Sequence, residues 1–310
     1  MKRRWQYVGL ILGVWLVYLG FSLATPQPAS STRYHLSNTT VNLIRVTFEL
    51  PFLFCWLYAV SGWLHFRDYI KGRPHDHEHQ AFAKIAQGLL TLIIGLIVPT
   101  VISTIYLYYN NGASQGPLWV RINNYINIFF PLLGFLWMLK GSQQLMNTLK
   151  LKVTSWSKII TVLIPVSLFA VFYLALIFTN PTRQSSPDAT LPATYYLPDV
   201  LIILTIIIPV ICTWVMGLLL ALNLEQFSHH TVRSHQLALV SFYNGVLAIV
   251  GGAILSQALS SLGSHRFSKL NVGLILSLVY LLLLIITVGY GLIARGAKKL
   301  AQADTHIATG

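Results

Sequence analysis

Charged residues are scarce in this sequence. Only 9% of its 310 residues are charged, 55% are hydrophobic, and the mean hydropathy is +0.65. A soluble domain carries about 25% charged residues, so this balance excludes an ordinary soluble protein and predicts an integral membrane protein. The sequence also has only two cysteines, Cys55 and Cys212, each inside a long apolar run. Two cysteines are too few for a disulfide framework.

Recognisable catalytic and cofactor motifs are absent as well. The sequence contains no G-x-S-x-G and no H-E-x-x-H, and it places no histidine in the middle of an apolar run, where a membrane haem would need one. The net charge of +13 comes from basic residues at the ends of apolar runs, without a nucleic-acid-binding motif. We therefore expect no catalytic site, no resident cofactor and no nucleic-acid partner.

Long apolar runs are what the sequence has in abundance. A helix needs about 20 apolar residues to cross a hydrocarbon layer of about 30 Å. Eight runs reach this length, at residues 5–25, 41–66, 85–109, 122–147, 158–179, 199–223, 237–262 and 270–294. Continuous runs of this kind lack the alternation of barrel strands. The sequence predicts an all-α bundle of eight transmembrane helices.

The lysines and arginines between these runs predict the orientation of the bundle. Fifteen of the 21 fall on one side, and the other six are Arg33, Arg45, Arg121, Arg183, Arg266 and Lys269. Cytoplasmic loops carry the excess of basic residues. We expect both termini on the cytoplasmic side of the cell membrane. The expected partners are membrane lipid and other membrane proteins.

Four anchors recur along the chain at nearly one spacing, which predicts an internal duplication. The matching positions are Pro51 and Trp56 with Pro209 and Trp214, Gly88 and Gly95 with Gly245 and Gly252, Gly141 with Gly296, and Pro26 with Pro181. They predict two four-helix repeats, 1–152 and 153–310. Because each repeat has an even number of spans, the two would be parallel and related by a pseudo-twofold axis along the membrane normal. The alternative is chance similarity among apolar helices.

Small residues form a ridge on the run 237–262. Ser241, Gly245, Gly252, Ser256 and Ser260 lie on nearly one helical face. Such ridges let helix backbones approach closely in a membrane. Close packing is the favoured interpretation, and a glycine-lined pore is the alternative.

Charges inside an apolar run are candidate functional sites. Arg45 and Glu49 are four residues apart in the run 41–66, so they share a helical face and can pair. The pair is either a structural tie or a ligand or proton site. Asn123 and Asn127, near the start of the run 122–147, are either helix caps and hydrogen-bonding groups or substrate contacts.

The most polar segment reads PHDHEHQ, from Pro74 to Gln80. In an extended loop His75, His77 and His79 would point the same way and could hold a divalent transition metal such as zinc or nickel. A second segment with His235-Gln236 occupies the place equivalent to His79-Gln80 in the proposed repeat. Three interpretations stay open: solvated residues, a pH-responsive patch, or a metal site that includes His235.

Two main classes of function remain from the sequence, and an unrecognised membrane enzyme is the remaining alternative. The first is a membrane subunit, assembly factor or sensor that acts through helix and loop contacts. The second is a transporter or channel for a small solute, with a path between the two repeats, as parallel repeats allow. A polar cavity between the repeats favours the second class, and a closely packed seam favours the first.

Overall fold

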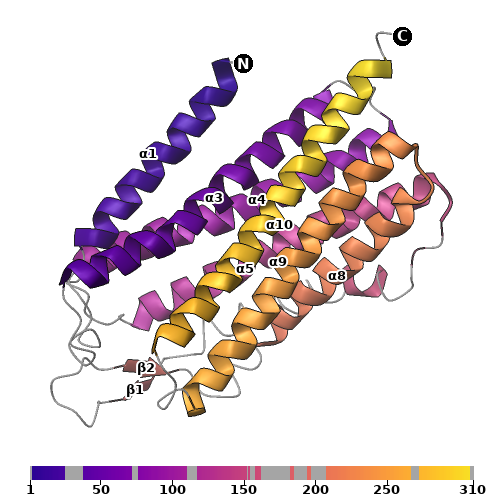
Figure 1. The fold of residues 1–310 in the computed structure, drawn as a ribbon. Coiled ribbons are helices and arrows are strands. Elements are labelled where there is room, and N and C mark those ends of the chain that lie inside the picture. Colours follow the sequence, from indigo (N-terminus) through magenta and orange to yellow (C-terminus); the bar gives the residue numbers. More distant parts are fainter. Residues whose placement is uncertain are drawn as a thin grey trace. The chain divides into compact units, whose positions relative to one another are not determined.

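A computed structural model describes residues 2–24, 38–71, 76–109, 117–151, 153, 158–161, 182–184, 194–196, 207–266 and 272–307. Within these residues the chain is almost entirely helical (Figure 1). The exceptions are β1 (Thr182–Gln184) and β2 (Thr194–Tyr196), which pair antiparallel with Thr182 opposite Tyr196. The prediction of a helical protein is confirmed for the described residues, apart from this short pair of strands.

The described part of the chain holds seven long helices. They are α1 (Lys2–Ala24), α3 (Asn38–Lys71), α4 (His77–Tyr109), α5 (Pro117–Thr148), α8 (Ile208–Ser228), α9 (Arg233–Arg266) and α10 (Val272–Ile307). Six of them, all but α5, are long and apolar enough to cross a membrane, as an integral membrane protein requires. The fifth predicted run, 158–179, lies outside the described residues except for 158–161.

The helices extend beyond the apolar runs that predicted them, and α4 shows why. Asp76 caps its start, because one carboxylate oxygen accepts a hydrogen bond of 2.7 Å from the His79 backbone N–H. His77 and His79 are therefore part of the first turn of α4, and not of an extended loop as the sequence suggested. Near the C-terminus, α10 continues to Ile307, thirteen residues beyond the end of the apolar run 270–294.

The chain divides into two compact units, and each contains segments of both predicted repeats. Unit 1 comprises Met1–Leu50, Thr91–Leu133 and Val162–Cys212, and unit 2 comprises Pro51–Leu90, Gly134–Thr161 and Thr213–Gly310. In unit 1, α1 contacts the end of α4, with the rings of Phe21 and Tyr108 5.1 Å apart. Unit 2 contains all of α9 and α10, which run side by side (Figure 1).

Unit 2 has a closely packed interior of large apolar side chains. Fully buried members are Trp56, Phe66, Met138, Leu139, Met216, Leu220, Leu224, Phe242 and Ile293. They come from α3, α5, α8, α9 and α10, so helices of both predicted repeats contribute to one core. This core determines the positions of the helix ends at which the histidines lie.

Glycines bring the helices of unit 2 into direct backbone contact. A Cβ atom placed on Gly141 of α5 would lie 2.6 Å from the Ala81 carbonyl oxygen of α4. A Cβ atom on Gly296 of α10 would lie 2.6 Å from the Ala238 carbonyl oxygen of α9. Contacts this short leave room for hydrogen only, as at the small-residue interfaces of membrane helices.

In a second set of contacts the glycine lies on α4 or α9, and the carbonyl group that it meets lies on α5 or α10. A Cβ atom on Gly245 would lie 2.5 Å from the Gly289 carbonyl oxygen, and one on Gly88 would clash with the Gly134 carbonyl oxygen. Positions in α4 and α9 correspond at an offset of 157, and positions in α5 and α10 at an offset of 155. The pairs α4–α5 and α9–α10 thus use glycines at corresponding places to meet corresponding carbonyl groups. A neighbouring helix therefore fills the small-residue ridge at Gly245, and another fills the corresponding place of α4 at Gly88.

Candidate functional site

The histidines chosen from the sequence lie in several places. His77 and His79 are two residues apart on α4, about 200° around the helix, so they face different sides. His77 lines a pocket of about 330 Å³ together with Gln80, Gln144, Asn147 and Thr148. His235 lies in the first turn of α9. His75 is outside the described residues.

The described residues hold no group of three His, Cys, Asp or Glu side chains arranged to bind a metal ion. His75 is one of the four proposed ligands and lies outside that search. A site for a divalent transition metal at His75, His77, His79 and His235 therefore stays a prediction.

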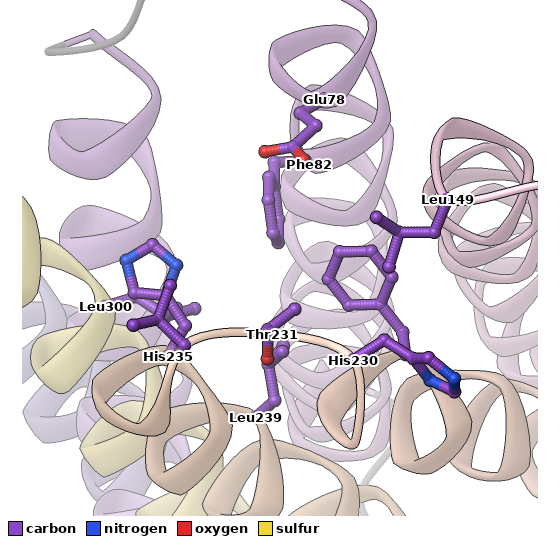
Figure 2. A pocket seen from close by; sticks show the side chains of 10 residues that line it. Glu78, Phe82, Leu149, His230, Thr231, His235, Leu239 and Leu300 are labelled. Atoms are coloured by element: carbon purple, nitrogen blue, oxygen red, sulfur yellow. The ribbon is translucent and has the colours of Figure 1, made fainter.

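A second pocket, of about 270 Å³, lies in unit 2 where α4 and α9 begin, and we call it the α4–α9 pocket. Its polar lining residues are Glu78, His230, Thr231 and His235, and its apolar ones are Phe82, Leu149, Phe227, Val232, Leu239 and Leu300. Figure 2 shows Glu78 and Phe82 on one helix, opposite His235, Thr231 and Leu239. The pocket brings the PHDHEHQ segment together with the second histidine segment.

Helical spacing explains how two polar and two apolar residues reach this pocket. Glu78 and Phe82 are four apart on α4, and His235 and Leu239 are four apart on α9, so each pair shares a helical face. At the offset of 157 given by the glycine contacts, Glu78 corresponds to His235 and Phe82 to Leu239. The sequence had aligned His79 with His235. The packing offset instead pairs an acid with an imidazole at corresponding positions.

An aromatic side chain from α3 lies against both sides of the pocket. The Tyr69 ring makes edge contacts with Phe82, at 5.2 Å between centroids, and with His235, at 6.4 Å. Tyr69 is almost fully buried. Aromatic edge contacts of this kind have a preferred geometry, so Tyr69 helps to hold the Phe82 and His235 rings in place.

Hydrogen bonds within the turn before α9 determine which groups can donate to a ligand. The His230 Nδ1 atom lies 3.0 Å from the Gln226 carbonyl oxygen, which can only accept. Nδ1 therefore carries the proton, and Nε2 of the neutral ring is an acceptor. The Thr231 hydroxyl donates its one proton to the Ser228 carbonyl oxygen at 2.9 Å. Together with the Glu78 carboxylate, these groups offer acceptors to the pocket.

The intramembrane carboxylate Glu49 has a partner that the sequence did not reveal. In unit 1 the Tyr18 hydroxyl of α1 donates a hydrogen bond to Glu49, and Thr104 of α4 donates to the Tyr18 oxygen. Tyr18 is 6% exposed. Tyr18 of α1 thus links Glu49 of α3 with Thr104 of α4. The side chains of Arg45, Asn123 and Asn127 lie outside the described part of α3 and α5, so their pairing and binding roles stay predictions.

Polar contacts also join helices of the two predicted repeats within unit 2. The Cys55 sulfur of α3 lies 3.1 Å from the Thr287 hydroxyl oxygen of α10. That hydroxyl also lies 2.7 Å from the Leu283 carbonyl oxygen and 3.3 Å from the Pro51 carbonyl oxygen. The sequence indicated Cys55 as a buried thiol but gave no sign of Thr287, because the contact joins residues 232 positions apart.

A second such contact joins α8 to α5. The Asn223 side-chain amide donates a hydrogen bond of 3.1 Å to the Ser142 hydroxyl oxygen, which in turn donates to the Leu139 carbonyl oxygen at 2.9 Å. Both Asn223 and Ser142 are buried. Buried polar groups that are paired in this way hold helices together in a membrane.

No protein-family model, curated protein or solved structure matches this chain.

Proposed function

We propose that this chain is a non-catalytic, multi-pass integral membrane protein that acts as a membrane subunit, assembly factor or sensor through helix and loop contacts. The observation that carries the proposal is the closed contact, within unit 2, between helices of the two sequence halves. Both termini are assigned to the cytoplasmic side of the cell membrane, on the distribution of lysine and arginine.

The contact is closed along α3 and α10. Near the middle of the α3 span, Cys55 meets Thr287 at 3.1 Å. Two helical turns further on, a Cβ atom on Gly62 would lie 3.3 Å from the Ala294 Cα atom. At this spacing the two backbones are in contact, and no solute can pass between them at these positions.

The contact is also closed between other helix pairs of unit 2. The rings of Phe66 on α3 and Phe242 on α9 have centroids 5.4 Å apart. A Cβ atom on Gly217 of α8 would lie 3.2 Å from the Phe135 ring of α5. Together with the hydrogen bond between Asn223 and Ser142, these contacts support a packed seam.

The arrangement as two parallel four-helix repeats, 1–152 and 153–310, is part of the proposal. Its support is the recurrence of glycine contacts at Gly88 and Gly141 in the first half and at Gly245 and Gly296 in the second. A glycine against a carbonyl group at two pairs of corresponding positions favours a duplication over chance similarity between apolar helices.

The reactivity of Cys55 tests the proposal against the transporter or channel alternative. In a Cys212→Ser background, Cys55 is the only thiol of the chain. We expect it to resist a membrane-impermeant methanethiosulfonate reagent added from either side of proteoliposomes, because it is 2% exposed and packed against Thr287. The readout is intact-protein mass spectrometry.

Two controls make the result decisive. A Ser234→Cys variant in a background without both native thiols reports access at an exposed position of α9, and denaturation in detergent should release the reactivity of Cys55. Rapid modification of Cys55 in the folded protein would indicate a water-filled path between the halves. It would favour the transporter or channel and contradict the packed seam.

A further inference from the structure

We infer that the α4–α9 pocket binds a small amphipathic amine, with its ammonium group at Glu78 and its apolar body against Phe82, Leu239 and Leu300. The juxtaposition that carries this inference joins a carboxylate on α4, an imidazole at the corresponding position of α9, and a shared apolar wall. This goes beyond the proposed function, since a ligand site can exist whether or not the seam of unit 2 is closed.

The charge of the lining selects a cation. Among the ten lining residues Glu78 carries the one formal charge when imidazoles are neutral. An anion of similar size would meet this carboxylate and would be repelled by it. A bare metal ion would lack a ligand set, because the described residues hold no metal-binding group of three.

The hydrogen-bonding roles of the lining select a donor. The Glu78 carboxylate can only accept, the neutral His230 ring presents its Nε2 lone pair, and the Thr231 proton is already used in the turn. A primary ammonium group has three donors and no acceptor. It can therefore donate to Glu78 and His230 together, whereas a hydroxyl has one donor and a carboxylate has none.

The volume and the apolar lining of the pocket limit the size and the polarity of the ligand body. A volume of about 270 Å³ is slightly below the range of about 300–1,000 Å³ found for drug-sized ligands, so the site suits one ring or a short chain. Six apolar side chains from α4, α8, α9, α10, the end of α5 and the turn before α9 surround it. Burial of the apolar body against them supplies affinity, and the ammonium supplies orientation.

The correspondence between α4 and α9 gives the pocket its direction. Phe82 and Leu239 are apolar on both helices, whereas Glu78 and His235 differ in charge. A ligand with one charged end can therefore bind in one orientation only, with its charge toward α4. Because it would contact the first turns of α4 and α9 together, its binding would couple the two helix starts, as a sensor requires.

The test uses the purified full-length protein and two matched probes, 2-phenylethylamine and 3-phenylpropionate, in titration calorimetry at pH 8. We expect saturable binding of the amine at one site and no binding of the acid. Glu78→Gln should weaken amine binding at least tenfold, and Leu239→Trp should abolish it by filling the pocket. Glu225→Gln removes a carboxylate of α8 that does not line the pocket and should leave binding unchanged.

Equal binding of amine and acid, or amine binding that survives both Glu78→Gln and Leu239→Trp, would overturn the inference.

The amine could be a free metabolite-sized molecule or the headgroup of a membrane lipid, and one further arm separates them. The protein is placed in nanodiscs of phosphatidylcholine, with or without phosphatidylethanolamine. Loss of 2-phenylethylamine binding when phosphatidylethanolamine is present would assign the site to the lipid ammonium group. Unchanged binding would assign it to a soluble amine.

Discussion

Gly245→Ala is expected to destabilise the protein by at least about 1–3 kcal/mol, the usual cost of overpacking a closely packed interior. The added Cβ would lie 2.5 Å from the Gly289 carbonyl oxygen and 2.9 Å from the Ile293 backbone nitrogen. Both are backbone atoms of α10, so the clash is relieved only if the two helices move apart. Thermal unfolding of the detergent-purified protein measures the effect.

A matched control lies six residues further along the same helix. A Cβ atom on Gly251 would meet nothing within 4 Å, so Gly251→Ala should stabilise α9 by about 0.5–1 kcal/mol, the ordinary gain of alanine over glycine in a helix. Gly88→Ala, the corresponding change in α4, should destabilise as Gly245→Ala does. If Gly245→Ala were as stable as Gly251→Ala, the close crossing of α9 and α10 would be wrong.

Trp56→Ala is expected to cost about 3–5 kcal/mol, the range for removing a large aromatic side chain from a protein core. Trp56 is 0% exposed and lies in α3 within unit 2. Membrane helices are held together by packing contacts, because lipid gives them no hydrophobic drive to associate. The contacts that the indole ring makes in the core would therefore be lost. The measurement is again the unfolding midpoint in detergent, with helicity followed by circular dichroism.

Phe54→Ala provides the comparison for this second substitution. Phe54 is two residues from Trp56 on the same helix but is 46% exposed, so lipid or detergent can cover the surface that its removal leaves. We expect its effect to be small. Equal losses from Phe54→Ala and Trp56→Ala would mean that α3 does not present Trp56 to the core.

The membrane class could be predicted from the sequence because it depends on composition and on the length of apolar runs. The ends of the helices could not, since a helix continues past the bilayer wherever its polar residues reach water. The start of α4 illustrates this. Asp76 lies within the PHDHEHQ segment that the sequence favoured as a loop, and its carboxylate caps the helix and brings His77 and His79 into the first turn.

Individual candidate residues could be identified from the sequence, but the side chains that they contact on other helices could not. Glu49 stood out as a charge in an apolar run, yet Tyr18 and Thr104 come from other helices and have no distinctive spacing. Likewise His235 was singled out, but its counterpart in the pocket is Glu78. A shift of one residue in the alignment of the repeats decides this pairing. The His-Gln pairs align at an offset of 156, whereas Gly88 and Gly245 align at 157, and the glycine contacts between helices favour the second offset.

The packed seam between the halves is the central claim, and cross-linking of α3 to α10 tests it most directly. In a Cys212→Ser, Thr287→Cys variant, the native Cys55 would face the introduced thiol at a position where sulfur and oxygen are now 3.1 Å apart. Mild oxidation in membranes should form the disulfide nearly completely, as peptide mass spectrometry would show, because small rotations reach the bond length of about 2.05 Å. Val288→Cys, one residue on and 57% exposed, should form little. Failure of the Thr287→Cys variant to cross-link, or equal cross-linking of both variants, would contradict the packed seam.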